Sequence, residues 1–431
     1  MTLEHEVRPV RTALLAPWFP DKATRTPETA LDEAEGLCRA IALDLQWVEQ
    51  VRMNTPRPAT LIGGGKIEEV AAAAKALDLE LLVVDAALTP TQQRNLERAV
   101  DLKVIDRTGL ILEIFGERAR TREGRLQVEL AHLNYQRSRL VRSWTHLERQ
   151  RGGAGFTGGP GESQIELDRR MIDDRIVQLE KALEKVRLTR ELHRKTRRET
   201  PFPVVALVGY TNAGKSTLFN RLSGADVFAK DLLFATLDPT MRAVELTDGR
   251  PVIMSDTVGF VADLPTQLVA AFRATLEEVL EADIILHVRD ASDPEMAAQA
   301  EDVRAILGSM GIEIDNNPRI IEVYNKSDRL SGEVRASITE QAIMPEHPGV
   351  VISAITGDGL DALSAEVASR LARDRVEISE TVSASDGADI AWIYRNAEIL
   401  DRQDNEDGVH FHLRLTPADA GRWRKRRQAG L

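Results

Sequence analysis

The sequence contains very little cysteine, since Cys38 is the only one among its 431 residues. A single cysteine forms neither an internal disulfide nor a cysteine metal cluster, and it favours a reducing, cytoplasmic compartment. Long apolar runs are also absent, because none approaches the ~20 residues that a membrane span needs. The first residues, MTLEHEVRPVRT, have no long apolar stretch and no cleavage-like site, so we expect no secretory signal.

Apolar and charged residues are present in ordinary amounts, 43% and 29% of the chain. This composition is typical of globular proteins, and 431 residues predict two to four domains. The formal net charge is −12, yet residues 117–199 contain 20 lysines and arginines against 13 acidic residues. That basic segment predicts contact with a polyanion, although a charged, solvated helix surface would give the same composition.

Residues 1–116 alternate between short apolar runs and helical patterns. The runs TALLA, LVVD and KVID predict strands, and the segments KIEEVAAAAKAL and TPTQQRNLERAV predict the helices between them. Strands that alternate with helices form parallel sheets, so we expect a small N-terminal α/β domain.

Residues 117–199 change to a heptad pattern, in which apolar residues recur three, four or seven positions apart. The two series are Leu126, Leu130, Leu133, Leu140, Trp144 and Leu147, then Ile172, Ile176, Leu179, Leu183 and Val186. The segment between them, RGGAGFTGGPGES (151–163), is rich in glycine. This pattern predicts a long antiparallel helical hairpin with a glycine-rich tip.

Residues 200–372 again alternate between buried strands and helices. The runs VVALVG, VIMSD, DIILHV and RIIEVYN predict strands of a mostly parallel sheet. Residues 373–431 contain the strand-like VHFHLRL and end in the basic RWRKRR, which predicts a small C-terminal α/β domain with a basic tail. The fold class expected for the whole chain is therefore multidomain α/β.

The segment GYTNAGKS follows the strand VVALVG and precedes a helical pattern. Its Gly209, Gly214, Lys215 and Ser216 have the spacing of a phosphate-binding loop. The glycines let consecutive N–H groups point at phosphate oxygens, and the N-terminus of the helix adds its positive end. We expect Lys215 to bridge the β- and γ-phosphates and Ser216 to place its hydroxyl on Mg²⁺.

Three later motifs also follow predicted strands and identify the nucleotide. DTVG predicts a water-mediated Mg²⁺ contact from Asp256 and an N–H from Gly259 close to the γ-phosphate. In NKSD, Asp328 can accept both the N1–H and the exocyclic amine of guanine, a donor pair that adenine lacks. A lost charged hydrogen bond costs about 1.5–3 kcal/mol. In SAI, the N–H near Ala354 would reach guanine O6, so the predicted ligand is GTP.

These motifs resemble those of translation-factor-related P-loop GTPases. FATLDPT followed by DTVGF, together with LIGGGK, ELAHLNYQRSRL and RGGAGFTGGPGESQIELDRR, is similar to the HflX family of ribosome-associated GTPases. The resemblance covers roughly residues 10–372 and is loose beyond them. It implies a GTPase that binds the large (50S) ribosomal subunit and splits, rescues or regulates ribosomes under stress, with the N-terminal domain and the hairpin approaching ribosomal RNA.

The resemblance also implies roles for single residues. Thr236 looks like the switch threonine that completes Mg²⁺ coordination, with Thr240 as its competitor. Phe260 stands where Ras-like enzymes carry the glutamine that orients water, so we expect slow intrinsic hydrolysis that a partner stimulates. Asn212 resembles the asparagine of potassium-stimulated GTPases, which makes K⁺ a candidate second cation. A local turn hydrogen bond is the alternative interpretation of Asn212.

The expected site combines all of these motifs. Lys215, Thr236 and Gly259 are the catalytic candidates, while Ser216 and Thr236 would ligate Mg²⁺ directly and Asp256 through water. The expected GTP contacts are Gly209, Tyr210, Thr211, Asn212, Ala213, Gly214, Lys215, Ser216, Thr217, Phe234, Ala235, Thr236, Leu237, Asp238, Asp256, Thr257, Val258, Gly259, Asn325, Lys326, Ser327, Asp328, Ser353, Ala354 and Ile355.

Arginines on the two predicted hairpin helices suit phosphate, and we expect them to contact RNA. The first helix carries Arg137, Arg139 and Arg142. The candidate RNA contacts are Arg149, Arg151, Arg169 and Arg170, together with Phe156, whose ring would stack on a base or cover the end of the hairpin. The expected partners are GTP, GDP and the large ribosomal subunit, and we expect a monomer.

Three further interpretations concern a second phosphate loop, a tRNA-modifying GTPase and a nucleotide-gated scaffold. The segment GGGK (63–66) lacks the Ser or Thr and the spacing of a second phosphate loop, so we expect a turn into a helix near Lys66. A tRNA-modifying GTPase would carry a C-terminal cysteine motif, and Cys38 is the only cysteine. A nucleotide-gated scaffold with negligible turnover stays open because Phe260 cannot orient water by hydrogen bonding.

Overall fold

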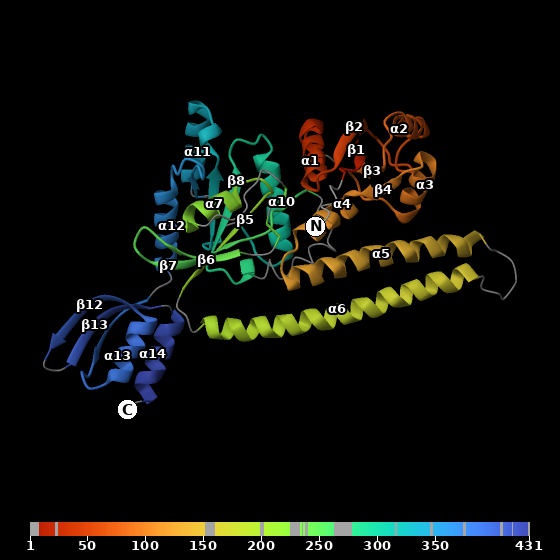
Figure 1. Cartoon of the computed structure of the whole chain (residues 1–431). Helices are drawn as coiled ribbons and strands as arrows, with labels where there is room; N and C mark the ends of the chain where they lie inside the picture. Colours follow the sequence, from red (N-terminus) through yellow and green to blue (C-terminus); the bar gives the residue numbers. More distant parts are fainter. Residues whose placement is uncertain are drawn as a thin grey trace, which may run out of the picture.

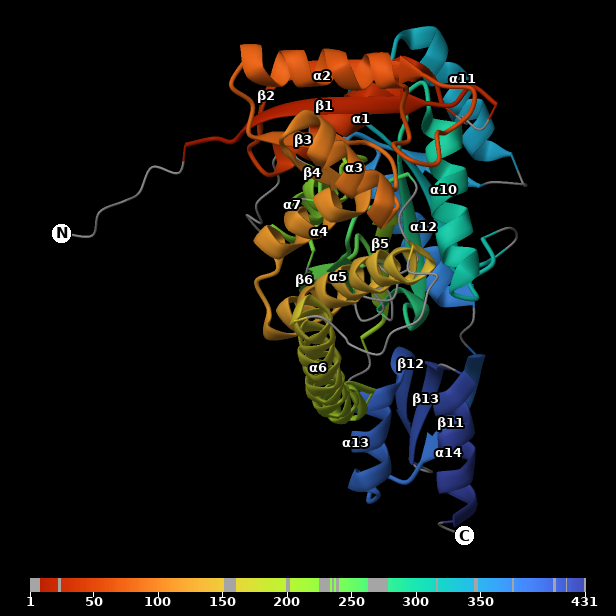
Figure 2. The same ribbon diagram turned by 90° about the vertical axis from the view of Figure 1, so that its right-hand side faces the viewer.

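The chain forms two neighbouring α/β bodies, a long helical hairpin and a separate C-terminal domain (Figures 1 and 2). The computed structural model describes residues 8–21, 25–150, 160–198, 202–224, 233–234, 236–237, 240–262, 278–314, 317–344, 348–373, 376–405, 408–415 and 417–429. Within these residues no helix combines the length and the apolar character needed to cross a membrane.

The N-terminal body is a four-stranded parallel sheet in the order β2-β1-β3-β4, with helices between the strands. Its elements are β1 (Arg11–Trp18), α1 (Pro27–Ala40), β2 (Asp44–Arg52), α2 (Gly64–Ala76), β3 (Leu81–Val84), α3 (Pro90–Val100), β4 (Lys103–Asp106) and α4 (Arg107–Arg118). The expected strands and helices of this domain are therefore confirmed. Strand β2 is half-buried along most of its length and was not among the predicted strands.

The predicted hairpin consists of α5 (Arg122–Gln150) and α6 (Pro160–Arg198), which lie side by side in Figure 1. Ile176 and Leu179 of the expected heptad series are buried. The expected glycine-rich tip was 151–163, but α6 already begins at Pro160, because proline suits the first turn of a helix. Residues 151–159, which include Arg151 and Phe156, lie outside the described residues.

The second body is a six-stranded sheet in the order β10-β9-β8-β5-β7-β6, parallel except for the edge strand β6. Its elements are β5 (Val204–Gly209), α7 (Lys215–Ser223), β6 (Thr240–Glu245), β7 (Pro251–Asp256), β8 (Ile284–Asp290), α10 (Met296–Ser309), β9 (Ile320–Asn325), α11 (Gly332–Ile343), β10 (Gly349–Val351) and α12 (Leu360–Arg373). The carboxyl ends of parallel strands meet at one edge of a sheet, which brings the four predicted motifs together.

The C-terminal domain is a three-stranded antiparallel sheet in the order β11-β13-β12, covered by two helices. Its elements are β11 (Val376–Val382), α13 (Gly387–Asn396), β12 (Glu398–Asn405), β13 (Gly408–Leu415) and α14 (Pro417–Ala429). Trp423 is fully buried in its small core and stacks on Trp392. The expected basic tail is thus part of a packed helix, where Arg426 pairs with Asp389.

One apolar core joins the N-terminal sheet to the six-stranded sheet. It contains Leu37 and Phe115 from the first body and Phe234 and Phe260 from the second. The rings of Phe115 and Phe234 meet edge to face, with centroids 4.7 Å apart. The N-terminal domain therefore packs directly against the segments that surround the predicted phosphate-binding loop.

Candidate active site

The predicted phosphate-binding loop requires glycine at both ends. Gly209 has φ +150°, and a Cβ there would lie 2.1 Å from the carbonyl oxygen of Val288. Gly214 has φ +91°, and its Cβ would lie 2.2 Å from Nδ2 of Asn325. Helix α7 begins at the next residue, Lys215, so its N-terminus points into the loop.

Lys215 reaches back over this loop from the start of α7. Its Nζ donates to the carbonyl oxygens of Gly209 at 3.1 Å and Tyr210 at 2.7 Å. The residue is only 6% exposed, and this burial lowers the pKa of the ammonium group to about 8, although Asp256 opposes the shift. A neighbouring phosphate would therefore supply a strong stabilising charge to Lys215.

Ser216, Thr236 and Asp256 form a compact cluster of oxygen atoms. Oδ2 of Asp256 accepts hydrogen bonds from Ser216 at 2.7 Å and from Thr236 at 2.8 Å, and the two hydroxyls are 2.9 Å apart. Burial raises the pKa of Asp256, and its Oδ1 is buried without a hydrogen-bond partner among the described residues. Mg²⁺ prefers such oxygen ligands, so these residues fit the predicted metal site.

Gly259 lies tightly against the phosphate-binding loop. A Cβ on it would be 2.8 Å from Cγ2 of Thr211 and 3.0 Å from Nζ of Lys215. The backbone N–H of Thr211 donates to the carbonyl of Phe260 at 2.7 Å, and the N–H of Phe260 donates to Gly209 at 3.1 Å. These hydrogen bonds hold the DTVGF segment beside the loop, as the expected γ-phosphate role of Gly259 requires.

The predicted base-recognition residues are connected to each other and to the loop. Nδ2 of Asn325 donates to the carbonyl of Ala213 at 2.8 Å, and its Oδ1 accepts from the N–H of Ala354 at 3.0 Å. The hydroxyl of Ser353 donates to Asp328 at 2.6 Å, which orients the carboxylate. The structure thus brings NKSD and SAI together beside the phosphate-binding loop.

Several expected GTP contacts turn their side chains into the protein. The ring of Phe234 packs on Phe115, Val258 belongs to the same core, and Thr257 donates its hydroxyl to the carbonyl of Leu207 at 2.5 Å. Their side chains point away from the site because the strands and switch segments pack on the core there. Ala235 and Asp238 lie outside the described residues.

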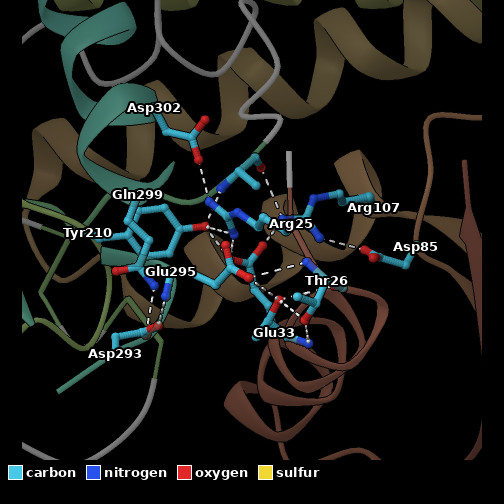
Figure 3. Close-up of polar contacts among 12 residues, drawn as sticks. Arg25, Thr26, Glu33, Asp85, Arg107, Tyr210, Asp293, Glu295, Gln299 and Asp302 are labelled. Carbon is cyan, nitrogen blue, oxygen red and sulfur yellow. Dashed lines mark hydrogen bonds and ion pairs between the residues drawn. The ribbon is translucent and has the colours of Figure 1, made fainter. Parts of the chain in front are cut away.

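Tyr210 also directs its side chain away from the loop, toward the N-terminal domain (Figure 3). Its hydroxyl donates to Glu33 and accepts hydrogen bonds from Nη1 of Arg25 at 2.7 Å and from the N–H of Ala262 at 2.6 Å. Arg25 also pairs with Glu33 at 2.8 Å and with Asp302. Five residues from both bodies therefore share one polar network.

Arg107 extends this network, as Figure 3 shows. Its guanidinium pairs with Glu33 and with Asp85 at 2.6 Å, and donates to the carbonyl of Ala262 at 3.0 Å. Burial raises the pKa of Glu33, but Arg107 and Arg25 outweigh this effect and the net shift is downward. Arg25, Glu33 and Arg107 were not among the predicted site residues, since no local spacing in the sequence connects them.

The expected RNA-binding arginines fall into different groups. Arg169 and Arg170 are exposed on α6, and Arg169 lies 3.8 Å from Asp173. Arg137 pairs with Asp173 at 3.3 Å, whereas Arg139 binds the largely buried Asp106 and donates to Gln93. Arg139 thus anchors the hairpin to the N-terminal domain, and Asp106 already pairs with its guanidinium group. The side chains of Arg142 and Arg149 lie outside those described.

Four family models match consecutive parts of the chain. They are described as GTP-binding GTPase N-terminal (residues 28–116), GTP-binding GTPase Middle Region (118–197), 50S ribosome-binding GTPase (204–326) and HflX C-terminal domain (337–430). The last match extends the likeness beyond residue 372, where the sequence motifs had matched only loosely. The first two models end at residues 116 and 197, near the expected boundaries at 116 and 199, whereas the last two meet between residues 326 and 337 and not at the expected boundary after 372.

Curated relatives match over nearly the whole length. GTPase HflX of Magnetococcus marinus is 48% identical over 420 residues, 97% of this chain and 96% of the relative. GTPase HflX of Escherichia coli K12 is 42% identical over 396 residues, 92% of this chain and 91% of the relative. Among solved structures, a GTP-binding protein from Sulfolobus solfataricus in complex with GDP has a TM-score of 0.46 at 22% identity, covering 84% of this chain and 98% of that one. This chain belongs to the HflX family, and it is a GTPase.

Proposed function

We propose that this GTPase binds the large ribosomal subunit and splits, rescues or regulates ribosomes under stress, in the state that GTP selects. The observation that carries the proposal is the match of residues 204–326 to the 50S ribosome-binding GTPase model. The hydrogen bond from Thr236 to Asp256, at 2.8 Å, supports a GTP-dependent switch at the nucleotide edge of that domain. We propose that the protein is cytoplasmic, because its proposed partner is the ribosome. We also propose that it is a monomer.

The hairpin supports RNA contact by its length and anchoring. Helix α6 has 39 residues, which span about 58 Å at 1.5 Å per residue. Figure 1 shows the far end of α5 and α6 extending beyond the N-terminal body. Arg139 ties the hairpin to Asp106, while Arg169 and Arg170 remain exposed further along. We infer that these two arginines, with Arg149, Arg151 and Phe156, contact ribosomal RNA.

We propose that Ser216 and Thr236 hold Mg²⁺ directly and that Asp256 does so through water. When bound, Mg²⁺ would neutralise charge that develops on the β- and γ-phosphate oxygens. Lys215 adds a second positive charge there, and the N–H of Gly259 is placed to approach the γ-phosphate. Asn212, which has φ +60° and is exposed, keeps K⁺ as a candidate second cation.

Sedimentation of ribosomes tests the main proposal. Whole ribosomes are mixed with the protein and either GDP or a non-hydrolysable GTP analogue, and the subunit profile is recorded. We expect the protein to sediment with large subunits in the analogue sample, and free subunits to increase if it splits ribosomes. A protein that stays unbound in both nucleotides would overturn the proposal, whereas binding without free subunits would favour rescue or regulation.

The contribution of the hairpin can be isolated with paired variants. Arg169→Ala combined with Arg170→Ala should weaken binding to large subunits and reduce the steepness of the salt dependence, by roughly 0.7–0.9 per lost phosphate contact. Arg175→Ala is the control, because Arg175 is similarly exposed on α6 but pairs with Glu129 at 2.7 Å. Equal affinities and equal slopes for both variants would mean that the arginines of α6 only form a solvated surface.

GTP turnover with and without large subunits separates the remaining alternatives. We expect a low basal rate that large subunits raise, because Phe260 cannot place the attacking water. A rate that stays near zero in both samples would favour a nucleotide-gated scaffold. The match of residues 337–430 to the HflX C-terminal domain, together with the curated HflX relatives, weighs against a tRNA-modifying GTPase.

A further inference from the structure

Ala262, the third residue after Gly259, has both of its backbone polar groups bound by side chains. Its N–H donates to the hydroxyl of Tyr210 at 2.6 Å, and its carbonyl accepts from Nη2 of Arg107 at 3.0 Å. Backbone groups in proteins bind mostly to other backbone groups. Two side chains on one loop residue, one from each body of the protein, therefore indicate that the position of this segment is controlled.

The two preceding residues are held from the other side, by the phosphate-binding loop and by the core. Phe260 donates its N–H to the carbonyl of Gly209 at 3.1 Å and accepts from the N–H of Thr211 at 2.7 Å. The side chains of Phe260 and Val261 are each 1% exposed, in the core shared with the N-terminal body. All three residues that follow Gly259 are therefore packed or hydrogen-bonded to a neighbour.

The hydroxyl of Tyr210 has a donor and two acceptor contacts in this arrangement (Figure 3). It donates to Glu33 and accepts from Nη1 of Arg25 at 2.7 Å and from Ala262. Burial and the neighbouring Glu33 carboxylate raise the pKa of Tyr210 well above its ordinary value, so the hydroxyl keeps its proton for Glu33. Because its hydrogen-bonding capacity is filled, the N-terminal domain fixes the direction in which it meets Ala262.

The partners of Tyr210 lie at the carboxyl edge of the N-terminal sheet. Arg25 comes after β1, Asp85 directly follows β3, and Arg107 begins α4 directly after β4. In open α/β sheets this edge is the usual place for a ligand. Here the side chain of Tyr210 occupies it, and the guanidinium carbon of Arg25 lies 4.9 Å from the centre of its ring. The first body thus holds a residue of the phosphate-binding loop much as such a sheet holds a ligand.

We propose that Tyr210 is a positioning residue, which holds the DTVGF segment so that the N–H of Gly259 is ready for the γ-phosphate. The proposal rests on the role proposed above for Gly259. A segment already in place raises the affinity for GTP, whose γ-phosphate would meet Gly259, and leaves that for GDP unchanged because GDP lacks this phosphate. The N-terminal domain contributes by fixing the hydroxyl of Tyr210 through Glu33 and Arg25.

Tyr210→Phe tests this role, because it removes the hydroxyl and keeps the ring in the core. We expect the affinity for a non-hydrolysable GTP analogue with Mg²⁺ to fall roughly tenfold, as for one lost hydrogen bond, while GDP affinity stays at the wild-type value. Tyr135→Phe is the matched control, since Tyr135 on α5 likewise donates its hydroxyl to a carboxylate of the N-terminal domain, Oδ1 of Asp106 at 2.6 Å. Its ratio of the two affinities should equal that of the wild type.

Hydrogen exchange at the amide of Ala262 supplies a second readout. In the GDP complex, exchange should be several-fold faster in Tyr210→Phe than in the wild type, because this N–H has lost its acceptor, and unchanged in Tyr135→Phe. A wild-type ratio of the two affinities in Tyr210→Phe would refute the proposal. An equal drop of that ratio in both tyrosine variants would refute it too, because general loss of stability would then explain the effect.

Gly259→Ala tests the premise separately. Its Cβ would lie 2.8 Å from Cγ2 of Thr211, so the segment must shift, and affinity for the analogue should fall more than affinity for GDP. Equal losses for both nucleotides would end the role of Gly259 and the proposal with it. If Gly259→Ala behaves as expected and Tyr210→Phe binds like the wild type, only the role of Tyr210 fails.

Discussion

Two segments of this chain bring glycines and a lysine to the start of a helix, and their surroundings are opposite. In GGGK, an added Cβ on Gly64 or Gly65 would meet nothing within 4 Å, and Lys66 pairs with Glu49 and Glu69 near the surface. In the phosphate-binding loop, Gly209 and Gly214 leave no room for a Cβ. Close backbone approach, rather than glycine content, distinguishes a phosphate loop from a turn.

The two lysines differ in the same way, in the groups that surround their charges. Lys66 lies between two carboxylates that already neutralise it, and the segment serves as the turn into α2 that the sequence predicted. Lys215 is buried with backbone carbonyls as hydrogen-bond partners. A lysine that no carboxylate pairs with directly is the one that can bind an anionic ligand.

The largest expected difference is in the rate of GTP hydrolysis after substitution of Lys215 or of Lys66. Lys215→Ala should lower GTP hydrolysis by roughly 1,000-fold or more, because a positive charge on the transferring phosphoryl group is lost. Lys66→Ala should leave the rate near that of the wild type. Turnover measured under saturating GTP checks both, and an equal loss in the two variants would contradict the comparison.

Glu33, in the buried network around Tyr210, and Glu49, beside Lys66, should contribute differently to the free energy of unfolding. Glu33→Ala leaves Arg25 and Arg107 with one carboxylate fewer in a buried network, and we expect the free energy of unfolding to fall by about 3–5 kcal/mol. Glu49→Ala removes one partner of the more exposed Lys66 and should cost at most about 1 kcal/mol. Urea unfolding of both variants is the measurement, and similar losses would show that burial does not matter here.

A substitution at Asp328 tests whether the six-stranded sheet presents this residue to the guanine base. Asp328→Asn replaces an acceptor by a donor, so GTP affinity should fall by roughly one to two decades and preference should move toward xanthine nucleotides. Titrations with GTP, ATP and xanthosine triphosphate check this. A wild-type protein that bound ATP and GTP equally would contradict the assignment of Asp328.

The smallest effect is expected from the monovalent cation. If Asn212 helps to hold K⁺ near the phosphates, hydrolysis should be several-fold faster in K⁺ than in Na⁺ at equal ionic strength. Asn212→Ala should remove the difference while GDP affinity stays unchanged. Equal rates in both salts would leave Asn212 as a turn residue.

The nucleotide edge was predictable because each motif follows its own buried strand. Asp256 ends β7 and Asn325 ends β9, and parallel strands in one sheet place such ends together. Some other elements have no sequence pattern that predicts them. The edge strand β12 is polar and almost fully exposed, so neither alternation nor apolar content marks it as a strand.

The sequence by itself predicted the chemistry, because the glycines, Lys215, Ser216 and Asp328 have the types and spacings expected of a guanine-nucleotide site. Only the tertiary structure decided which partners surround that chemistry. Arg25 and Tyr210 are separated by 185 positions, and Asn325 binds the carbonyl of Ala213, which lies 112 positions earlier. Local spacing encodes contacts within a strand–loop–helix unit, whereas contacts between domains depend on how whole surfaces pack.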